Sequence, residues 1–279
     1  MISKNLMQRL AVAAVAIPVI LFLVFKGGDG FLYFVLLLAA IGMYEYLHGM
    51  KFGIGSVFFF VPFLGAVGAV YLTATGQQLL GYYCLLAVFL VIGILNAVGK
   101  EPIKDLYFRE IYIMWGAFYI GLLYPFVYLI RGNAEYMQSA PGGWWIFYLL
   151  ASLWVCDTGA MFFGSQFGKH QLAPAVSPNK TIEGFVGGFI GAGVIAAIFK
   201  IFWLTDVGIH HFIYLSLVIA TFGQLGDLVE SLWKRAIGIK DSSAIIPGHG
   251  GVLDRFDSLL FAAPPVYLYL KYVMHAPWL

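Results

Sequence analysis

Long apolar stretches recur from one end of the chain to the other, separated by short polar segments. A helix needs roughly 20 mainly apolar residues to cross about 30 Å of hydrocarbon. Runs near that length lie at about 9–25, 31–49, 55–74, 79–98, 111–130, 144–163, 185–204, 212–233 and 258–275. The pattern predicts an all-α polytopic integral membrane protein with about nine transmembrane helices.

Composition agrees with this prediction. Hydrophobic residues make up 61% of the 279 positions and charged residues 11%, whereas soluble domains have about 45–50% and about 25%. No linker rich in Ser, Pro or Gly divides the chain, so we expect a single helical membrane domain over residues 1–279. Interior charge is sparse in the first five runs, where Glu45 is the main example. We interpret residues 1–143 as scaffold spans and residues 144–279 as the spans and cytoplasmic loops that carry the chemistry.

The distribution of charge predicts the orientation. Formal net charge is only +2, which gives no indication of binding to nucleic acid. With the N-terminus in the cytoplasm, 12 of the 16 Lys and Arg residues fall on the cytoplasmic side, as the positive-inside rule expects. Nine spans place the C-terminus on the other side. Lys26 and a glycine-rich turn lead from the first run into the second, so we interpret the first run as a retained anchor rather than a signal peptide.

One segment concentrates the polar residues of this apolar chain. Residues 231–257, SLWKRAIGIKDSSAIIPGHGGVLDRFD, hold four cations, three carboxylates, a histidine and four glycines. The preceding helix carries Asp227 and Glu230. These residue types indicate a site for a multiply charged anion, such as a phosphate ester, and its accompanying metal ions. The alternative is that Lys and Arg are simply common in cytoplasmic loops.

Carboxylates at two places in this region favour a cation site. Asp227, Glu230 and Lys234 share one helix face, and a charge at the centre of a membrane helix costs at least about 2.5–3.5 kcal/mol. An internal Glu230–Lys234 ion pair is the structural alternative. Asp254 and Asp257 begin the last run, where helix capping explains one of them. Two carboxylates opposite Asp227 suit Mg²⁺, which takes one or two carboxylates plus phosphate oxygens.

The turn at residues 247–251, PGHGG, supplies backbone freedom and open amides for an anion. Lys240 and Arg255 flank it. The chain has no G-x-x-x-x-G-K-(S/T) motif and no G-x-G-x-x-G after a strand, so the soluble nucleotide-binding folds are excluded. Any nucleotide must bind to helices and loops. A plain connecting turn is the alternative for this segment.

The order of these residues resembles a known signature. K-R-x4-K-D followed by P-x-H-G-G-x-x-D-R-x-D is similar to the motif of phosphatidate cytidylyltransferases, and D-x-x-A…FGK…SP-x-K-T-x-E-G, from Asp157 to Gly184, resembles the family's other shared block. The resemblance covers about residues 157–257. Trp233 departs from it, because a smaller aliphatic residue or Phe is expected there; the charged positions are intact.

The resemblance implies transfer of CMP from CTP to phosphatidic acid, giving CDP-diacylglycerol and pyrophosphate in phospholipid biosynthesis. It further implies Mg²⁺ as the essential ion, K⁺ as a second candidate cation, and a homodimer. A bacterial plasma membrane is the simplest location, and the distribution of charge places the site on the cytoplasmic face. The residues carried over as catalytic are Asp227, Lys240, Asp254 and Arg255. Those carried over as metal ligands are Asp227, Asp254 and Asp257. Those carried over as substrate-binding are Asp157, Lys169, Ser177, Lys180, Thr181, Lys234, Arg235, His249, Gly250 and Gly251.

Other functions stay open at this point. A CTP-dependent lipid kinase, or a cytidylyltransferase for another lipid phosphate, shares the same chemistry, and ordinary positive-inside charge accounts equally well for Lys169. An ion-coupled transporter is the alternative from another class, with Asp227 and Glu45 as midplane carboxylates. The clustering of polar groups at one membrane face argues against a transporter.

Overall fold

The computed structural model describes residues 4–132, 142–246, 248 and 250–275. These residues form nine helices and one small hairpin, with the bounds α1 (Lys4–Lys26), α2 (Gly28–Gly49), α3 (Val57–Ala74), α4 (Gln78–Ala97), α5 (Ile103–Arg131), α6 (Gly142–Phe167), β1 (Gln171–Ala173), β2 (Ser177–Thr181), α7 (Ile182–Phe202), α8 (Ile209–Ala236) and α9 (Leu253–Tyr272). The predicted all-helical architecture is confirmed.

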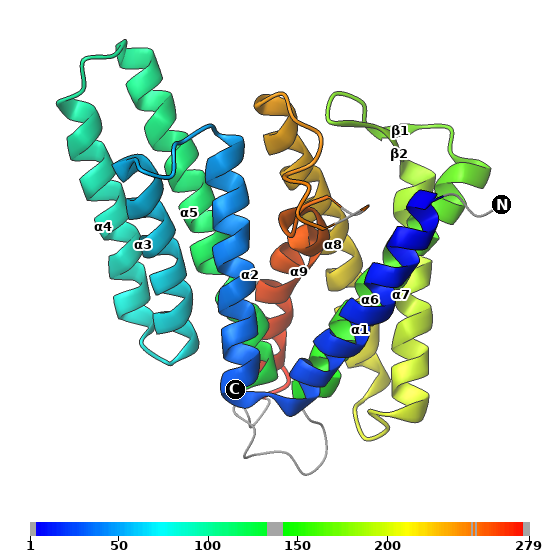
Figure 1. Ribbon diagram of the computed structural model, residues 1–279. Helices are drawn as coiled ribbons and strands as arrows, with labels where there is room; N and C mark the ends of the chain where they lie inside the picture. The colour runs from blue at the N-terminus through cyan, green and yellow to red at the C-terminus, as the bar shows by residue number, and fades with distance from the viewer. Residues whose placement is uncertain (1–3, 133–141, 247, 249, 276–279) are drawn as a thin grey trace.

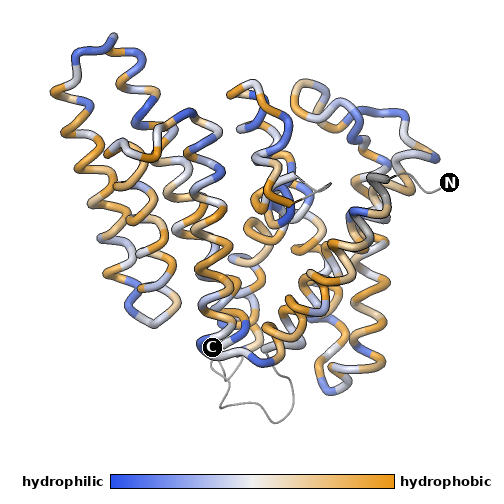
Figure 2. The backbone as a smooth tube through the Cα atoms, viewed as in Figure 1, coloured by the Kyte–Doolittle hydropathy of each residue, from blue (hydrophilic) through white to orange (hydrophobic). Residues whose placement is uncertain are grey.

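The helices correspond in order to the nine apolar runs. Among the described residues, the seven helices from α2 to α8 are long and apolar enough to cross a membrane, and α1 contributes the shorter apolar stretch Ala11–Lys26. Four charged residues reduce the apolar character of α9: Asp254, Arg255, Asp257 and Lys271. Hydrophilic residues gather toward the ends of the bundle and hydrophobic ones lie between them (Figure 2). The chain is a polytopic membrane protein.

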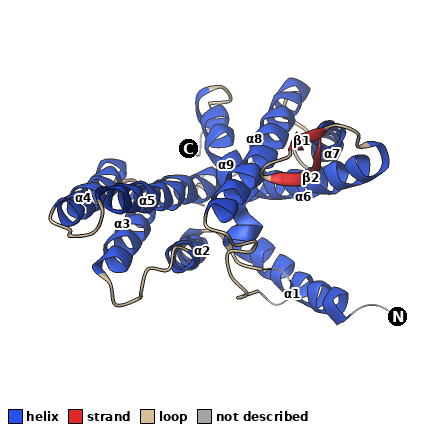
Figure 3. Ribbon diagram, turned by 90° about the horizontal axis from the view of Figure 1, so that it is seen from above, coloured by secondary structure: helices blue, strands red, loops and turns tan. Residues whose placement is uncertain are grey.

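The helices form two groups that meet at α9. One group is α3, α4 and α5 with α2 beside them; the other is α6 and α7 with α8. Seen from above, α3, α4 and α5 lie on one side of α9, and α6 and α7 lie on the other (Figure 3). Because α9 packs against α5 as well as α8, one apolar core runs through both groups. The division into a scaffold half and a catalytic half stays a prediction.

Close packing of α6 on α7 depends on small residues. A Cβ atom at Gly191 would overlap the carbonyl oxygen of Val155, and one at Gly187 would lie 2.5 Å from Cβ of Phe163. Glycine therefore lets the two helix backbones approach closely, as small residues do in bilayers. The same requirement holds at Gly226 in α8, where a Cβ would lie 2.8 Å from the carbonyl oxygen of Asp257.

The hairpin β1–β2 was not predicted from the sequence. It is antiparallel, with Gln171 opposite Thr181 and Ala173 opposite Ser177. Its polar residues and Pro178 hide any strand pattern. Thr181 ends the hairpin and caps α7, since its hydroxyl accepts a hydrogen bond from the backbone N–H of Gly184 at 3.0 Å. The hairpin lies at the same end of the bundle as the carboxyl end of α8 (Figure 1).

Candidate active site

A large cavity opens where α1, α6, α8 and α9 meet the loop that joins α8 to α9. Its volume is about 630 Å³. One wall is apolar and comes from α1 and α6: Val12, Ala13, Ala16, Ile17, Ile20, Leu150, Leu153 and Trp154. The other wall is charged: Asp157, Asp227, Lys234, Asp241, Asp254, Arg255 and Asp257. The charged wall holds five carboxylates and two cations, so the cavity suits a molecule with an apolar part and a charged part, and an anion there would need accompanying cations.

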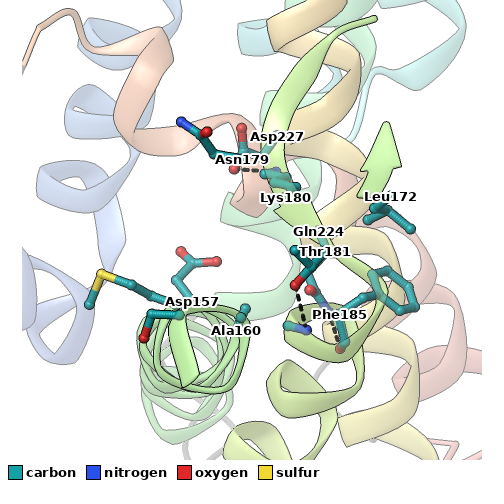
Figure 4. A pocket seen from close by; sticks show the side chains of 13 residues that line it. Asp157, Ala160, Leu172, Asn179, Lys180, Thr181, Phe185, Gln224 and Asp227 are labelled. Carbon is teal, nitrogen blue, oxygen red and sulfur yellow. Dashed lines mark hydrogen bonds and ion pairs between the residues drawn. The ribbon is translucent and has the colours of Figure 1, made fainter. Parts of the chain in front are cut away.

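A second cavity, of about 490 Å³, lies between α6, α7, α8 and the hairpin. Asn179, Lys180, Thr181 and Gln224 supply its polar lining together with two aspartates (Figure 4). Those two, Asp157 and Asp227, also line the larger cavity. The two cavities consequently adjoin at these carboxylates, which come from α6 and α8.

Asp227 is held at this junction by contacts from two elements. Nζ of Lys180 in β2 lies 2.6 Å from Oδ2 of Asp227, and the hydroxyl of Ser231 donates to Oδ1 at 3.3 Å. The Lys180 and Asp227 side chains are about one-third exposed, at 29% and 36%. The sequence placed Lys180 and Asp227 in separate roles, whereas the structure makes them an ion pair.

Lys234 bridges two buried acids. Its ammonium forms ion pairs with Glu230, one helical turn earlier, and with Oδ1 of Asp254 at 2.7 Å. The structural alternative for Glu230 is thus confirmed. Removing one partner from such a buried pair typically costs about 3–5 kcal/mol, because a charge is left uncompensated. Lys234 lines the larger cavity, so its predicted contact with substrate and its structural role compete for the same ammonium group.

Asp254 is saturated by donors from the protein itself. Its carboxylate accepts hydrogen bonds from the backbone N–H of Gly251 at 2.7 Å and of Ser242 at 2.9 Å, in addition to Lys234. The hydroxyl of Ser242 also lies within 3.1 Å. Since a carboxylate offers about four lone-pair sites, a cation at Asp254 would have to displace one of these donors. This geometry favours a role in organising the loop.

The carboxylate of Asp257 has fewer hydrogen-bond donors around it than that of Asp254. It is buried, lines the larger cavity, and accepts at 2.6 Å from the backbone N–H of Ser258, its neighbour in sequence. Gly226 lets the backbones of α8 and α9 come together beside it, which places Asp227 and Asp257 on the same cavity. Across the described residues, no three His, Cys, Asp or Glu side chains form a ready metal cluster. Two carboxylates nevertheless fit Mg²⁺ when phosphate oxygens complete the shell.

Of the remaining predicted site residues, some line the two cavities and others lie outside them. Arg255 is exposed and lines the larger cavity, and Thr181 lines the smaller one. The residues that lie outside both cavity linings are Lys169, Ser177, Arg235, Lys240, Gly250 and Gly251. Gly251 still belongs to the site through its N–H bond to Asp254, and Gly250, at φ +83°, forms a bridge with Ile246. His249 lies outside the described residues.

Sequence reasoning missed the part played by Glu45. This fully buried carboxylate of α2 accepts hydrogen bonds from the loop that carries Ser242 and from the first turn of α9. The only signal in the sequence was an acid in an otherwise apolar run. Asn179 and Gln224, which line the smaller cavity, were not predicted as site residues either, because Asn179 occupies the variable position of the SP-x-K motif and Gln224 belongs to no motif.

Comparisons with known proteins show the family of the chain. A model of the cytidylyltransferase family matches residues 7–273. The phosphatidate cytidylyltransferase of Bacillus subtilis is 35% identical over 274 residues, 95% of this chain and 98% of the relative. Those of Staphylococcus saprophyticus and Staphylococcus haemolyticus are 33% and 32% identical over 258 residues. The resemblance found in the two polar blocks thus extends along nearly the whole sequence, and the chain belongs to the cytidylyltransferase family.

Proposed function

We propose that the protein transfers CMP from CTP to phosphatidic acid, giving CDP-diacylglycerol and pyrophosphate. The observation that carries the proposal is the larger cavity, with one apolar wall and one charged wall, which adjoins a polar cavity at Asp157 and Asp227. A lipid phosphate and a nucleotide could bind on either side of this junction. The names of the relatives, phosphatidate cytidylyltransferases from bacteria, support the same activity.

The two substrates are assigned by the chemistry of the walls. Phosphatidic acid places its acyl chains against α1 and α6 in the larger cavity and its phosphate toward Arg255. CTP occupies the smaller cavity, where Asn179 offers its amide and Gln224 its amide oxygen to the base or ribose, and Lys180 offers a cation to the phosphates. This assignment brings the two phosphates together beside Asp227.

The reaction needs little acid or base chemistry. An oxygen of the phosphatidate monoester, already anionic near neutral pH, attacks the α-phosphorus of CTP. A new phosphorus–oxygen bond forms, the bond from the α-phosphorus to the bridging oxygen breaks, and pyrophosphate leaves with the electron pair. Positioning and charge neutralisation dominate such phosphoryl transfers. In this proposal Lys180 and Arg255 hold the phosphates and offset their charge, and Lys240, which is exposed and outside both cavity linings, attracts the leaving pyrophosphate.

The metal proposal rests on Asp227 and Asp257, which share one cavity wall. When bound, Mg²⁺ supplies a positive charge that neutralises the phosphate oxygens. Asp254, also predicted as a ligand, joins the loop to α9 through Ser242 and Gly251. K⁺ remains proposed as a second cation. We further propose a bacterial plasma membrane location with the site facing the cytoplasm, where CTP is available, and a homodimeric state.

Product analysis tests the proposal. Purified protein in detergent receives CTP, dioleoyl phosphatidic acid and Mg²⁺, and the soluble products are measured with time. We expect pyrophosphate, formed only when phosphatidic acid is present and in equal amount to CDP-diacylglycerol. Release of CDP with a phosphorylated lipid would instead identify a CTP-dependent lipid kinase. Formation of neither product by folded protein would contradict the enzymatic proposal altogether.

A further inference from the structure

Glu45 of α2 joins two ends of the loop between α8 and α9. Its Oε1 accepts hydrogen bonds from the hydroxyl of Ser243 at 2.6 Å and from the backbone N–H of Val252 at 2.9 Å. Its Oε2 accepts from the hydroxyl of Ser242 at 3.1 Å and from the backbone N–H of Leu253 at 2.9 Å. These four donors use about all the lone-pair sites that a carboxylate has. The side chain is fully buried.

The same carboxylate caps α9 from another helix. The first N–H groups of a helix have no partner within it and carry partial positive charge. At the start of α9, Val252 occupies the cap position and its side chain offers no acceptor. Glu45, about 200 positions earlier in the chain, supplies the acceptor and a negative charge instead. The direction in which α9 leaves the loop therefore depends on α2.

The start of α9 carries Asp254, Arg255 and Asp257, three of the residues of the charged wall of the larger cavity. Asp254 follows directly on the capped N–H groups of Val252 and Leu253, and Asp257 lies about one helical turn further along α9. Ser242 couples the two acids, because its hydroxyl lies 3.1 Å from Oε2 of Glu45 and 3.1 Å from Oδ2 of Asp254. A Cβ at Gly251 would lie 2.7 Å from both oxygens of Glu45, so a glycine is required where the loop passes the carboxylate.

We infer that Glu45 is a positioning residue of the transferase: it fixes the α8–α9 loop and the first turn of α9 so that the Asp257 and Arg255 side chains face the substrates. This inference rests on the proposed function of the larger cavity. Glu45 itself does not line that cavity. The N-terminal spans consequently contribute to the site in two ways, through the α1 side chains that line the larger cavity and through the Glu45 carboxylate of α2.

Isosteric and truncating substitutions at Glu45 test the inference. In Glu45→Gln, the amide oxygen can accept hydrogen bonds from one pair of these donors. The NH₂ group cannot accept from the other pair, because it is itself a donor. Glu45→Ala removes all four contacts. We expect kcat to fall on the order of tenfold to a hundredfold, as small misplacements of catalytic groups do, and the Mg²⁺ concentration for half-maximal rate to rise. Glu110→Gln is the matched control, since Glu110 accepts from Asn96 in the α4–α5 pair, away from the loop; its kcat stays within about twofold of wild type.

Hydrogen exchange supplies a readout that does not depend on activity. In the wild type, the amides of Val252 and Leu253 are expected to exchange slowly because Glu45 accepts from both. In Glu45→Gln, exchange in residues 241–253 should rise at least tenfold while the remaining helices keep their protection. Ser243→Ala, which removes one hydroxyl donor, should show a smaller rise in exchange over the same residues. This variant replaces the Glu45 variants in the test if they do not fold.

The outcomes separate this inference from the proposed function. If Glu45→Gln lowers thermal stability but leaves kcat and the Mg²⁺ requirement of the folded protein unchanged, Glu45 has only a structural role and the inference is overturned. Unchanged exchange in residues 241–253 of the Glu45 and Ser243 variants would overturn it as well. If wild-type protein makes no CDP-diacylglycerol, the proposed function fails, and the exchange experiment still decides whether Glu45 fixes the loop.

Discussion

Lys180 and Asp227 lie 47 positions apart in the sequence and form an ion pair of 2.6 Å at the junction of the two cavities. The pair fastens the hairpin to α8, and it sets a cation next to the carboxylate that we propose binds the metal. In the proposed cycle, phosphate groups of CTP compete with Asp227 for Lys180. Substrate binding and the release of this ion pair are therefore coupled.

Substitution of both partners should reveal this coupling. Lys180→Met and Asp227→Asn are each expected to lower kcat/KM for CTP by at least tenfold, because each removes a charge beside the phosphates. The double variant should lose much less than the product of the two effects, as contacting residues show coupling of about 0.5–3 kcal/mol. Steady-state kinetics of the wild type, the two single variants and the double variant would measure this coupling energy. Simple additivity would show that the two residues act independently.

Contact between α8 and α9 at Gly226 gives a second prediction. In Gly226→Ala, the new Cβ would press on the carbonyl of Asp257 and on Cβ of Phe261, both at 2.8 Å. Because the helices must separate, Asp227 and Asp257 move apart and the rate should fall by roughly tenfold or more. Gly193→Ala is the control, since a Cβ there meets nothing within 4 Å; its activity should be unchanged. Equal activity of both variants would argue against the paired carboxylates.

The apolar wall of the larger cavity predicts where the lipid binds. Ala16→Phe would place a ring in the cavity beside α6, whereas Val15→Phe changes the adjacent, 66% exposed position of α1. We expect Ala16→Phe to raise the KM for phosphatidic acid at least fivefold and to leave the KM for CTP near wild type, because only the acceptor uses this wall. Val15→Phe should change neither constant. A rise in the KM for CTP alone would reverse our assignment of the cavities.

Trp233, where the family resemblance predicts a smaller aliphatic residue or Phe, packs within the core. It is buried and stacks on Tyr46, with ring centroids 4.7 Å apart, outside both cavity linings. Trp233→Ala should lower the free energy of unfolding by about 3–5 kcal/mol, as large-to-small core changes do, and Trp233→Phe by clearly less. Thermal unfolding in detergent measures both. The folded fraction of Trp233→Phe should keep wild-type kcat; a large loss would place Trp233 in the catalytic machinery.

The sequence predicts the helices well because each apolar run is long enough to cross a bilayer and contains few charges. It also identifies the segments around Lys180 and Asp254, because cations and carboxylates are rare in such a chain. Pairing between residues far apart leaves no pattern of its own, so the Lys180–Asp227 ion pair and the contacts of Glu45 were not predictable. Backbone donors are equally invisible in a sequence, so the hydrogen bonds that Gly251 and Ser242 donate to Asp254 were not predictable, and the role of Asp254 as a metal ligand stays a prediction.

The central claim, nucleotidyl transfer at the junction marked by Asp227, is tested most directly by following label from CTP into lipid. Wild type, Asp227→Asn and Asp206→Asn are incubated with phosphatidic acid, Mg²⁺ and CTP labelled at either the α- or the γ-phosphate. Asp206 lies between α7 and α8, outside both cavities, and serves as the matched control. We predict that only the α-label enters the lipid, that Asp206→Asn transfers it at the wild-type rate, and that Asp227→Asn reduces transfer by at least about a hundredfold. Transfer of the γ-label, or undiminished α-label transfer by Asp227→Asn, would contradict the account.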